Sequence, residues 1–465
     1  MKASFVAIAA VGLFLVGGGT QAVQAQSLTD SFAAAYNNNP DLNLARSQLR
    51  SVDENIAIAR SGNRPLLFGS IDQSWQTTRT ILLNAPTFGG TSSRTTGTRA
   101  APTTFALQLT QPLFNGFQTR NAIRQAESAV RAQRSLLQNT EQNVLLQVAT
   151  SFFDVILNRK VVSLRRDDVS FLGEQIRAAQ DRFEVGEGTR TDVSQAEAAQ
   201  AQARALLNSA IADLANSEAT YKQVTGLTAG TLVDNITEDR YIPGSLPAAV
   251  QLGQRGHPAI IASLHDVDTA AFNVAQLEGQ FLPSLDIVGE ASTSLNQSGQ
   301  RQSDAASIGL NLTVPIYQGG RVSAEVRQAK EQLGSSRIQV DVTRDQVRQF
   351  TVSSWAVYQA ALASIQTSRT GVFAAQLALQ GVIEEQRVGQ RTTLDVLDSQ
   401  GDLVDAQITL VIAERERDVA AYTLISAIGN LNAQRLSLAV AIYQPQEHTD
   451  AVRDKWFGFR TPDGR

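Results

Sequence analysis

The sequence predicts a mainly helical fold with a smaller β part, in which one architecture is built twice. The segment from Ala106 to Glu127 returns further along the chain as Gly309 to Lys330, and the same offset relates Asp192 to Asp395. Long stretches without proline carry apolar residues at seven-residue spacing, which is typical of coiled-coil helices. Shorter stretches alternate between apolar and polar residues, which predicts two β-hairpins. Because the chain repeats itself, each of these elements is expected in two copies.

The first residues, 1–25, predict an export signal that is removed from the mature chain. Lys2 supplies a positive start, Phe5 to Val16 form an apolar run, and Val23 to Ala25 offer small residues at the cleavage position. The alternative is an uncleaved membrane anchor, but the apolar run is too short to span a bilayer comfortably. We therefore expect an exported protein.

Each repeat contains one predicted hairpin, over about 66–112 in the first copy and about 284–315 in the second. In the first strand, the odd-numbered residues Leu67 and Ile71 lie on one face, whereas the even-numbered Ser70 and Asp72 lie on the other. The remaining strands alternate in the same way, and their apolar parities hold Phe105, Leu107 and Leu109, then Leu285, Ile287 and Gly289, then Ile308, Leu310 and Leu312. These strands therefore have two unlike faces.

A polar loop rich in Thr, Gly and Ser is expected between the first two strands, from Thr77 to Thr103. Strands of about ten residues are long enough to cross a bilayer at a tilt. The strands of an ordinary β-sandwich would alternate in the same way. Two hairpins form no closed sheet, however, and open strand edges cannot lie in lipid. If these strands span a membrane, several chains must combine them.

The helical part of each repeat is predicted as a long helix, a tight turn and a shorter helix. The expected helices run from Gly116 to about Phe183, Asp192 to Val224, Gly320 to Gln386 and Leu394 to Ile428, with tip turns at 185–190 and 388–393. The seven-residue spacing is carried by Ile123, Val130, Leu137 and Val144 and by Val326, Leu333, Val340 and Val347. Such spacing predicts helices packed side by side along a coiled-coil seam.

Proline marks the four expected junctions between helix and strand, at Pro65, Pro112, Pro283 and Pro315. Proline cannot continue a helix and is tolerated at strand ends. The resulting division is a first repeat over 26–226, a linking or equatorial segment over 227–252, a second repeat over 253–429, and a C-terminal equatorial segment and tail over 430–465. For the tail, which includes Trp456, Phe457 and Phe459, the sequence suggests no role.

The composition argues against several classes of protein. The 465 residues include no cysteine, so the chain has neither disulfides nor an acylated N-terminal Cys. A net charge of -4 argues against a nucleic-acid partner. The three histidines are scattered, and no nucleophile elbow, phosphate-binding loop or zinc-protease motif occurs. We expect no enzyme, no cofactor and no metal site.

Several motifs together resemble the TolC family of outer-membrane efflux and secretion channels, over essentially the whole mature chain. They are the opening SLTDSFAAAYNNNPDL, the paired segments LQLTQPLF and LNLTVPIY, and the turns RFEVGEGTRTDV and QRVGQRTTLDVLD. The resemblance implies a homotrimer whose twelve strands close one barrel in the outer membrane of a Gram-negative bacterium, above a helical tunnel through the periplasm. The apolar strand parities would then face lipid, and Asp72 and Glu290 would face the lumen.

The same resemblance implies a passive conduit in a three-part export system. Its partners would be a periplasmic adaptor (membrane fusion) protein and an inner-membrane RND or ABC pump, and its cargo small molecules, proteins or both. Type I protein secretion and drug efflux both remain open at this point. An alternative from another class is a periplasmic coiled-coil scaffold or adhesin without a pore, against which the two-faced strands argue.

A candidate pore constriction is formed by Asp395 and Asp398, which lie three residues apart at the start of a helix. Taken alone, such carboxylates complement the helix dipole and need no other role. In a trimer, one inward carboxylate becomes a ring, and rings of Asp select cations. In the family this DVLD pair lines the periplasmic constriction, so the resemblance implies that role here.

A candidate gate latch also follows from the resemblance. By motif position, Arg391 matches the latch arginine, Asp192 its acidic partner and Gln175 a further partner. At Gln386 the chain departs from the family prototype, which carries a tyrosine there. The alternative for Arg391 is a solvated surface charge, since exposed ion pairs contribute only about 0–1 kcal/mol each.

The two tip turns contain Val185, Gly186 and Thr189 in the first repeat and Val388, Gly389 and Thr392 in the second. Glycine is expected there because it ends a helix in the left-handed conformation without strain. The resemblance adds that these exposed tips dock the hairpin ends of the adaptor. Both roles are compatible.

Overall fold

The computed structural model describes residues 26–87, 90–233, 238–295, 302–462 and 464; the expected export signal at 1–25 lies outside them. The described residues group into two compact units. Among the described residues, the first unit draws on 26–37, 147–233 and 365–415, and the second on 38–146, 238–364 and 416–464, without the gaps given above. Each unit takes segments from both sequence repeats.

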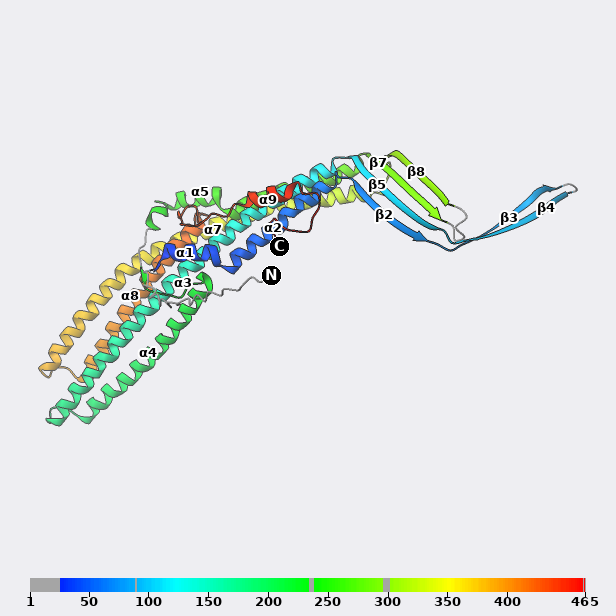
Figure 1. Cartoon of the computed structure of the whole chain (residues 1–465). Coiled ribbons are helices and arrows are strands. Elements are labelled where there is room, and N and C mark those ends of the chain that lie inside the picture. The colour runs from blue at the N-terminus through cyan, green and yellow to red at the C-terminus, as the bar shows by residue number, and fades with distance from the viewer. Residues whose placement is uncertain (1–25, 88–89, 234–237, 296–301, 463, 465) are drawn as a thin grey trace, which may run out of the picture. The chain divides into compact units, whose positions relative to one another are not determined.

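Helices make up most of the chain, as predicted (Figure 1). The described helices are α1 (Leu28–Asn38), α2 (Pro40–Ser61), α3 (Gln118–Glu184), α4 (Arg190–Thr225), α5 (Leu246–Gly256), α6 (Pro258–Glu278), α7 (Arg321–Arg387), α8 (Thr393–Ala427) and α9 (Pro445–Arg453). Short 3-10 turns, η1 and η2, cover Glu238–Tyr241 and Gly279–Phe281. The long helices α3 and α7, and the shorter helices α4 and α8 that follow them, begin and end within about two residues of the predicted bounds. None of the helices in the described ranges is both long and apolar enough to cross a membrane.

Six of the eight residues predicted for the seven-residue seams are buried, whereas Ile123 and Leu333 are half-buried. Val130, Leu137 and Val144 of α3 are at most 7% exposed, and Val340 and Val347 of α7 are equally well covered. In the second unit, Val130 packs with Ile56 of α2 and Ala126, while Leu424 and Ile428 of α8 join Ala249 and Tyr358. In the first unit, α3 and α4 meet through Leu172, Ala196 and Ala203, and Leu397 of α8 packs against them. The heptad spacing therefore did identify the core faces.

The strands β2 (Leu66–Gln73), β5 (Thr103–Asn115), β7 (Ser284–Leu295) and β8 (Gln302–Thr313) form one antiparallel sheet in the second unit, in the order β2-β5-β7-β8. Its register aligns the apolar parities of all four strands on one face, where the facing pairs include Ile71–Phe105, Leu107–Ala291, Ile287–Leu310 and Leu285–Leu312. Asp72 and Glu290 lie on the other face, because side chains alternate across a pleated sheet. The two predicted hairpins are thus one sheet with two unlike faces.

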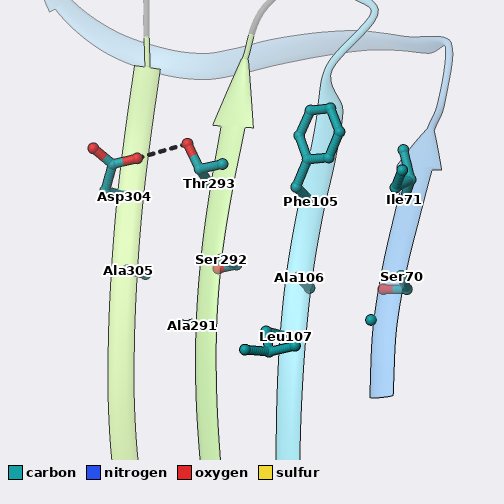
Figure 2. A pocket seen from close by; sticks show the side chains of 11 residues that line it. Ser70, Ile71, Phe105, Ala106, Leu107, Ala291, Ser292, Thr293, Asp304 and Ala305 are labelled. Atoms are coloured by element: carbon teal, nitrogen blue, oxygen red, sulfur yellow. Dashed lines mark hydrogen bonds between the residues drawn. The ribbon is translucent and has the colours of Figure 1, made fainter. Parts of the chain in front are cut away.

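Figure 2 shows the four strands side by side around a shallow hollow, with Ile71 of β2, Phe105 and Leu107 of β5, and smaller side chains of β7 and β8. The Thr293 hydroxyl donates to Asp304 at 2.6 Å and ties β7 to β8. The outer strands β2 and β8 each have one edge that pairs with no strand in the described part of the chain. The sheet therefore ends in two open edges.

The loop expected between Thr77 and Thr103 is instead a second antiparallel pair. Strands β3 (Gln76–Thr87) and β4 (Gly90–Ala100) face each other from Gln76 opposite Ala100 onward, with an irregularity between Leu82 and Ala85. Threonine, which dominates this segment, favours extended backbone as strongly as many apolar residues do. Polar composition alone therefore gave the wrong prediction here.

Three of the four junction prolines lie where they were expected. Pro65 precedes β2, Pro283 precedes β7, and Pro315 follows β8. Pro112 lies inside β5 instead, directly before a register shift between Pro112 and Phe114. Proline is accommodated at such a bulge because the ladder is already interrupted there.

The linking segment and the tail are also structured. Strand β1 (Gln26–Ser27) pairs in parallel with β6 (Leu232–Val233), so these two residues are tied to the linking segment. In the linking segment, Pro247 lies in the first turn of α5, which runs past the expected boundary at 252. Helix α9 lies in the tail and packs against α2.

Candidate gate site

Both tip turns end their long helices in the same way. After α3, Gly186 has φ 81°, and its amide donates to the carbonyl of Phe183 while the Glu187 amide donates to Arg182 at 2.8 Å. After α7, Gly389 has φ 76°, and the same pair of hydrogen bonds recurs. This left-handed closure satisfies the last carbonyls of each helix.

The tips themselves are open. Val185 and Val388 are each 71% exposed. A Cβ added at Gly186 or Gly389 would meet no atom within 4 Å. Within one chain, glycine is therefore required by the positive φ of the turn and not by crowding, and the space around each glycine is open.

The threonine that follows each turn caps the next helix. Thr189 precedes α4, and its amide and hydroxyl donate to Asp192 Oδ2 at 2.9 and 2.6 Å, while the Asp192 amide donates back to Thr189 Oγ1. Thr392 makes the same reciprocal arrangement with Asp395 at the start of α8. These are capping boxes with aspartate in the position often held by glutamate. The residues predicted as tip and gate positions are thus linked in pairs.

These hydrogen bonds also set the charge of the two carboxylates. The donors of Thr392, and to a lesser degree Arg391, hold the pKa of Asp395 below its ordinary value. Thr189 lowers the pKa of Asp192 in the same way, with a smaller contribution from Arg182. Both carboxylates therefore carry a negative charge at any physiological pH.

The orientation of Asp395 and Asp398 is fixed by the residues between them. Val396 and Leu397 are buried in the contacts of α8 with α7 and α3. Residues three apart share a helix face, so Asp395 and Asp398 lie together away from that packed side, and Asp398 is exposed. The structure thus brings the two predicted constriction carboxylates onto one open face.

The predicted latch residues are only partly brought together. Arg391 donates from Nε to Glu385 at 2.9 Å and lies 3.9 Å from Asp395, so its ion pairs within one chain are with its own turn. Asp192 is held by its capping box rather than by Arg391. The latch between helical pairs is therefore not formed inside one described chain.

Gln386 bridges two segments. It accepts from Arg182 Nη2 and donates to Thr393 Oγ1, both at 3.4 Å. Gln175 is half-buried on α3. Glu385 is the residue that sequence reasoning missed; the available signal was a pair of opposite charges flanking a glycine turn.

The comparisons with known proteins agree with this geometry. The family described as outer membrane efflux protein matches residues 33–227 and 250–430. The chain is 47% identical over 450 residues to the outer membrane efflux protein BepC of Brucella suis biovar 1 (strain 1330), which covers 96% of this chain and 94% of BepC. It is 27% identical over 443 residues to the outer membrane protein TolC of Escherichia coli (strain K12), covering 92% of this chain and 86% of TolC.

A solved structure shows the same fold. The Campylobacter jejuni CmeC outer membrane channel superposes with a TM-score of 0.74 at 18% identity, covering 92% of this chain and 89% of that one. The matching proteins are channels of the outer membrane rather than enzymes. The chain therefore belongs to the outer membrane efflux protein family, and it is a TolC-like export channel protein of the outer membrane.

Proposed function

We propose that three copies of this chain form one passive channel, in which twelve strands, four from each chain, close a barrel in the outer membrane. The observation that supports this most strongly is the sheet with one apolar face and two open edges. An open edge is not tolerated in lipid. Pairing β8 of one chain with β2 of the next removes every edge and turns the apolar faces outward.

The helices would continue the barrel as a tunnel. Several large apolar side chains of α7 have no cover within one chain: Ile338 and Phe373 are 66% and 69% exposed, and Val357 and Leu377 are 58% and 60% exposed. Residues of this kind suit the flank of a helix that packs against a neighbouring chain. These uncovered side chains of α7 thus support a wall of helices shared between chains.

Asp395 and Asp398 would form the constriction of this tunnel. Around a three-fold axis each position contributes three carboxylates, which attract and select cations. Arg391 would hold the entrance shut by pairing across chains with Asp192, whose carboxylate retains acceptor positions beyond those used in its capping box. Gln175 and Gln386 would add polar contacts to this latch.

The tips would receive a periplasmic adaptor, which connects the channel to an inner-membrane pump. Val185, Gly186 and Thr189 and their partners Val388, Gly389 and Thr392 form two similar, exposed surfaces per chain, as a repeating partner requires. The genome neighbourhood distinguishes the pump class. An adjacent RND pump predicts export of small molecules, and an adjacent ABC transporter with its adaptor predicts protein secretion.

The test of the channel is a planar bilayer measurement on the purified mature protein. We expect discrete, cation-selective conductance steps from a heat-resistant trimer extracted from the outer membrane with detergent. A periplasmic scaffold or adhesin would yield a protein that fractionates without detergent and leaves the bilayer silent, and that result would reject the proposal.

A further inference from the structure

The segment after α9 carries three large aromatic side chains that the chain itself leaves uncovered. Trp456, Phe457 and Phe459 are 64%, 89% and 107% exposed. Clustered apolar side chains at a surface mark a place of interaction, in contrast to single exposed ones. Neither the gate nor the sheet uses these residues.

Buried contacts hold this segment in place. On α2, Asp53 is fully buried and accepts a hydrogen bond from the Thr449 hydroxyl at 2.9 Å, and His448 Nδ1 lies 2.9 Å from its other oxygen. Arg134 of α3 donates to the same hydroxyl at 2.7 Å, and Val452 is fully buried. Helix α9 is therefore docked on α2 and α3, and it presents the residues that follow it in a defined direction.

Arg64 places the aromatic residues next to the sheet. Its Nη1 donates to the carbonyl of Lys455 at 2.6 Å, and its guanidinium carbon lies 4.8 Å from the centre of the Trp456 ring. Strand β2 begins at Leu66, two residues after Arg64. Two Cα steps of about 3.8 Å and the length of the arginine side chain then place Trp456 on the order of 20 Å or less from the start of the sheet.

Other exposed aromatic residues occupy the same ends of the strands. Phe117 follows β5, Phe281 precedes β7, and Tyr317 follows β8, with exposures of 50%, 45% and 84%. Strands that span a membrane are flanked by girdles of aromatic residues at both interfaces. The segment after α9 adds three further rings at this level, although it lies far from the strands in the sequence.

We propose that residues 455–460 form an anchor in the periplasmic leaflet of the outer membrane, with phospholipid as the partner. The rings of Trp456, Phe457 and Phe459 would enter the boundary between headgroups and acyl chains, where aromatic side chains are favoured. The exposed Arg460 would remain among the phosphates. This inference rests on the proposed placement of the sheet in the membrane.

The test uses the three tryptophans of the chain, Trp75, Trp355 and Trp456, one at a time. Full-length protein carrying W75F and W355F retains only Trp456 and is reconstituted in phosphatidylcholine vesicles. We expect its fluorescence to fall when the lipid carries bromine near the headgroup end of the acyl chains. The matched control carries W75F and W456F and retains Trp355, which packs against the α5–α8 core; its fluorescence should not change.

A third variant separates this inference from the function proposed above. With W355F and W456F, Trp75 reports the far end of β2, where it is 78% exposed. Quenching of Trp75 without quenching of Trp456 overturns the anchor alone, and shielding of Trp456 from aqueous acrylamide would then assign the segment to a neighbouring protein. Absence of quenching at both positions overturns the placement of the sheet as well. In the variant with Trp456 alone, R64A should reduce the quenching; unchanged quenching would contradict the positioning by Arg64.

Discussion

Asp395 accepts hydrogen bonds from both the amide and the hydroxyl of Thr392, each at 2.8 Å. The same relationship joins Asp192 to Thr189 in the first repeat. A carboxylate proposed to line a constriction is thus also part of a helix cap, and its rotamer is fixed before any ion arrives. Asp398 is not part of this cap, so the capping role and the constriction role can be tested separately.

Replacing Thr392 with Ala should weaken the first turn of α8 by about 1 kcal/mol, because the cap is lost while both carboxylates remain. Hydrogen exchange of that turn should accelerate, and the cation selectivity should be largely retained. D398N should do the reverse, lowering the selectivity in a planar bilayer with unchanged exchange. Equal selectivity in D398N and the unaltered channel would remove Asp398 from the constriction.

Replacing Arg391 with Ser should raise the single-channel conductance, because the substitution removes the positively charged side chain that is proposed to hold neighbouring helices together at the entrance. The matched control is R387S, which removes the nearby arginine that pairs with Glu384 at 2.9 Å on its own helix. Conductance should change in the first variant and stay constant in the second. If both variants behave alike, Arg391 is only a surface charge.

Replacing Gly389 with Leu should impair export while the channel still assembles. The backbone at φ 76° would be strained by about 1–2 kcal/mol, and the new side chain would project into the space proposed for the adaptor. The control G381L places the same side chain on α7, also with open space around it, but without positive φ. We expect cross-linking to the adaptor to fail in G389L alone, and normal cross-linking there would argue against docking at this tip.

Replacing Glu141 with Gln should raise the thermal unfolding temperature at neutral pH. Burial raises the pKa of Glu141, although it accepts a hydrogen bond from the Ala433 amide at 2.7 Å. A raised pKa means that the folded state binds more protons, so the ionised carboxylate lowers stability at high pH, and this loss shrinks as the pH falls towards the ordinary value of 4.5. Glutamine keeps an acceptor oxygen without the charge.

The advantage of E141Q should therefore decrease between neutral pH and about 4.5. The control E331Q changes an exposed residue of α7 and should leave the unfolding temperature unaltered at each pH. Circular dichroism of the detergent-solubilised protein measures both. A pH-independent effect of E141Q would show that burial does not act through the carboxylate charge.

Periodicity predicted most of the fold because burial of the long helices follows a local rule. The seam residues Val130 and Val340 are buried, and the alternation of Ile71 and Phe105 was preserved in the register. Contacts between distant segments follow no local rule, so the sequence pattern did not predict them. Gly116 and Gly279 pack so closely that a Cβ on either would clash with the backbone of the other, yet nothing in the local sequence indicates that they meet.

The candidate site was predictable only in part, for the same reason. The positions of Asp395 and Gly389 follow from motif and turn chemistry, which are local. The pairing of Arg391 with Glu385 depends on how the turn folds back. The docking of the tail through Asp53 and Thr449 joins residues at opposite ends of the chain, and composition gave no hint of it.

The most direct test of the central claim is disulfide formation between β2 and β8 of neighbouring chains. The described chain has no cysteine to interfere. Within one chain β5 and β7 separate these strands by about 14 Å, whereas a disulfide requires Cα atoms within about 7 Å. S70C is combined in turn with a cysteine at Ala305, Ser307, Gly309 or Asn311, which share its face of the sheet.

At least one of these pairs should yield covalent dimers and trimers after oxidation in the outer membrane, which would show that three sheets close into one barrel. Monomers at every position in well-inserted protein would contradict it.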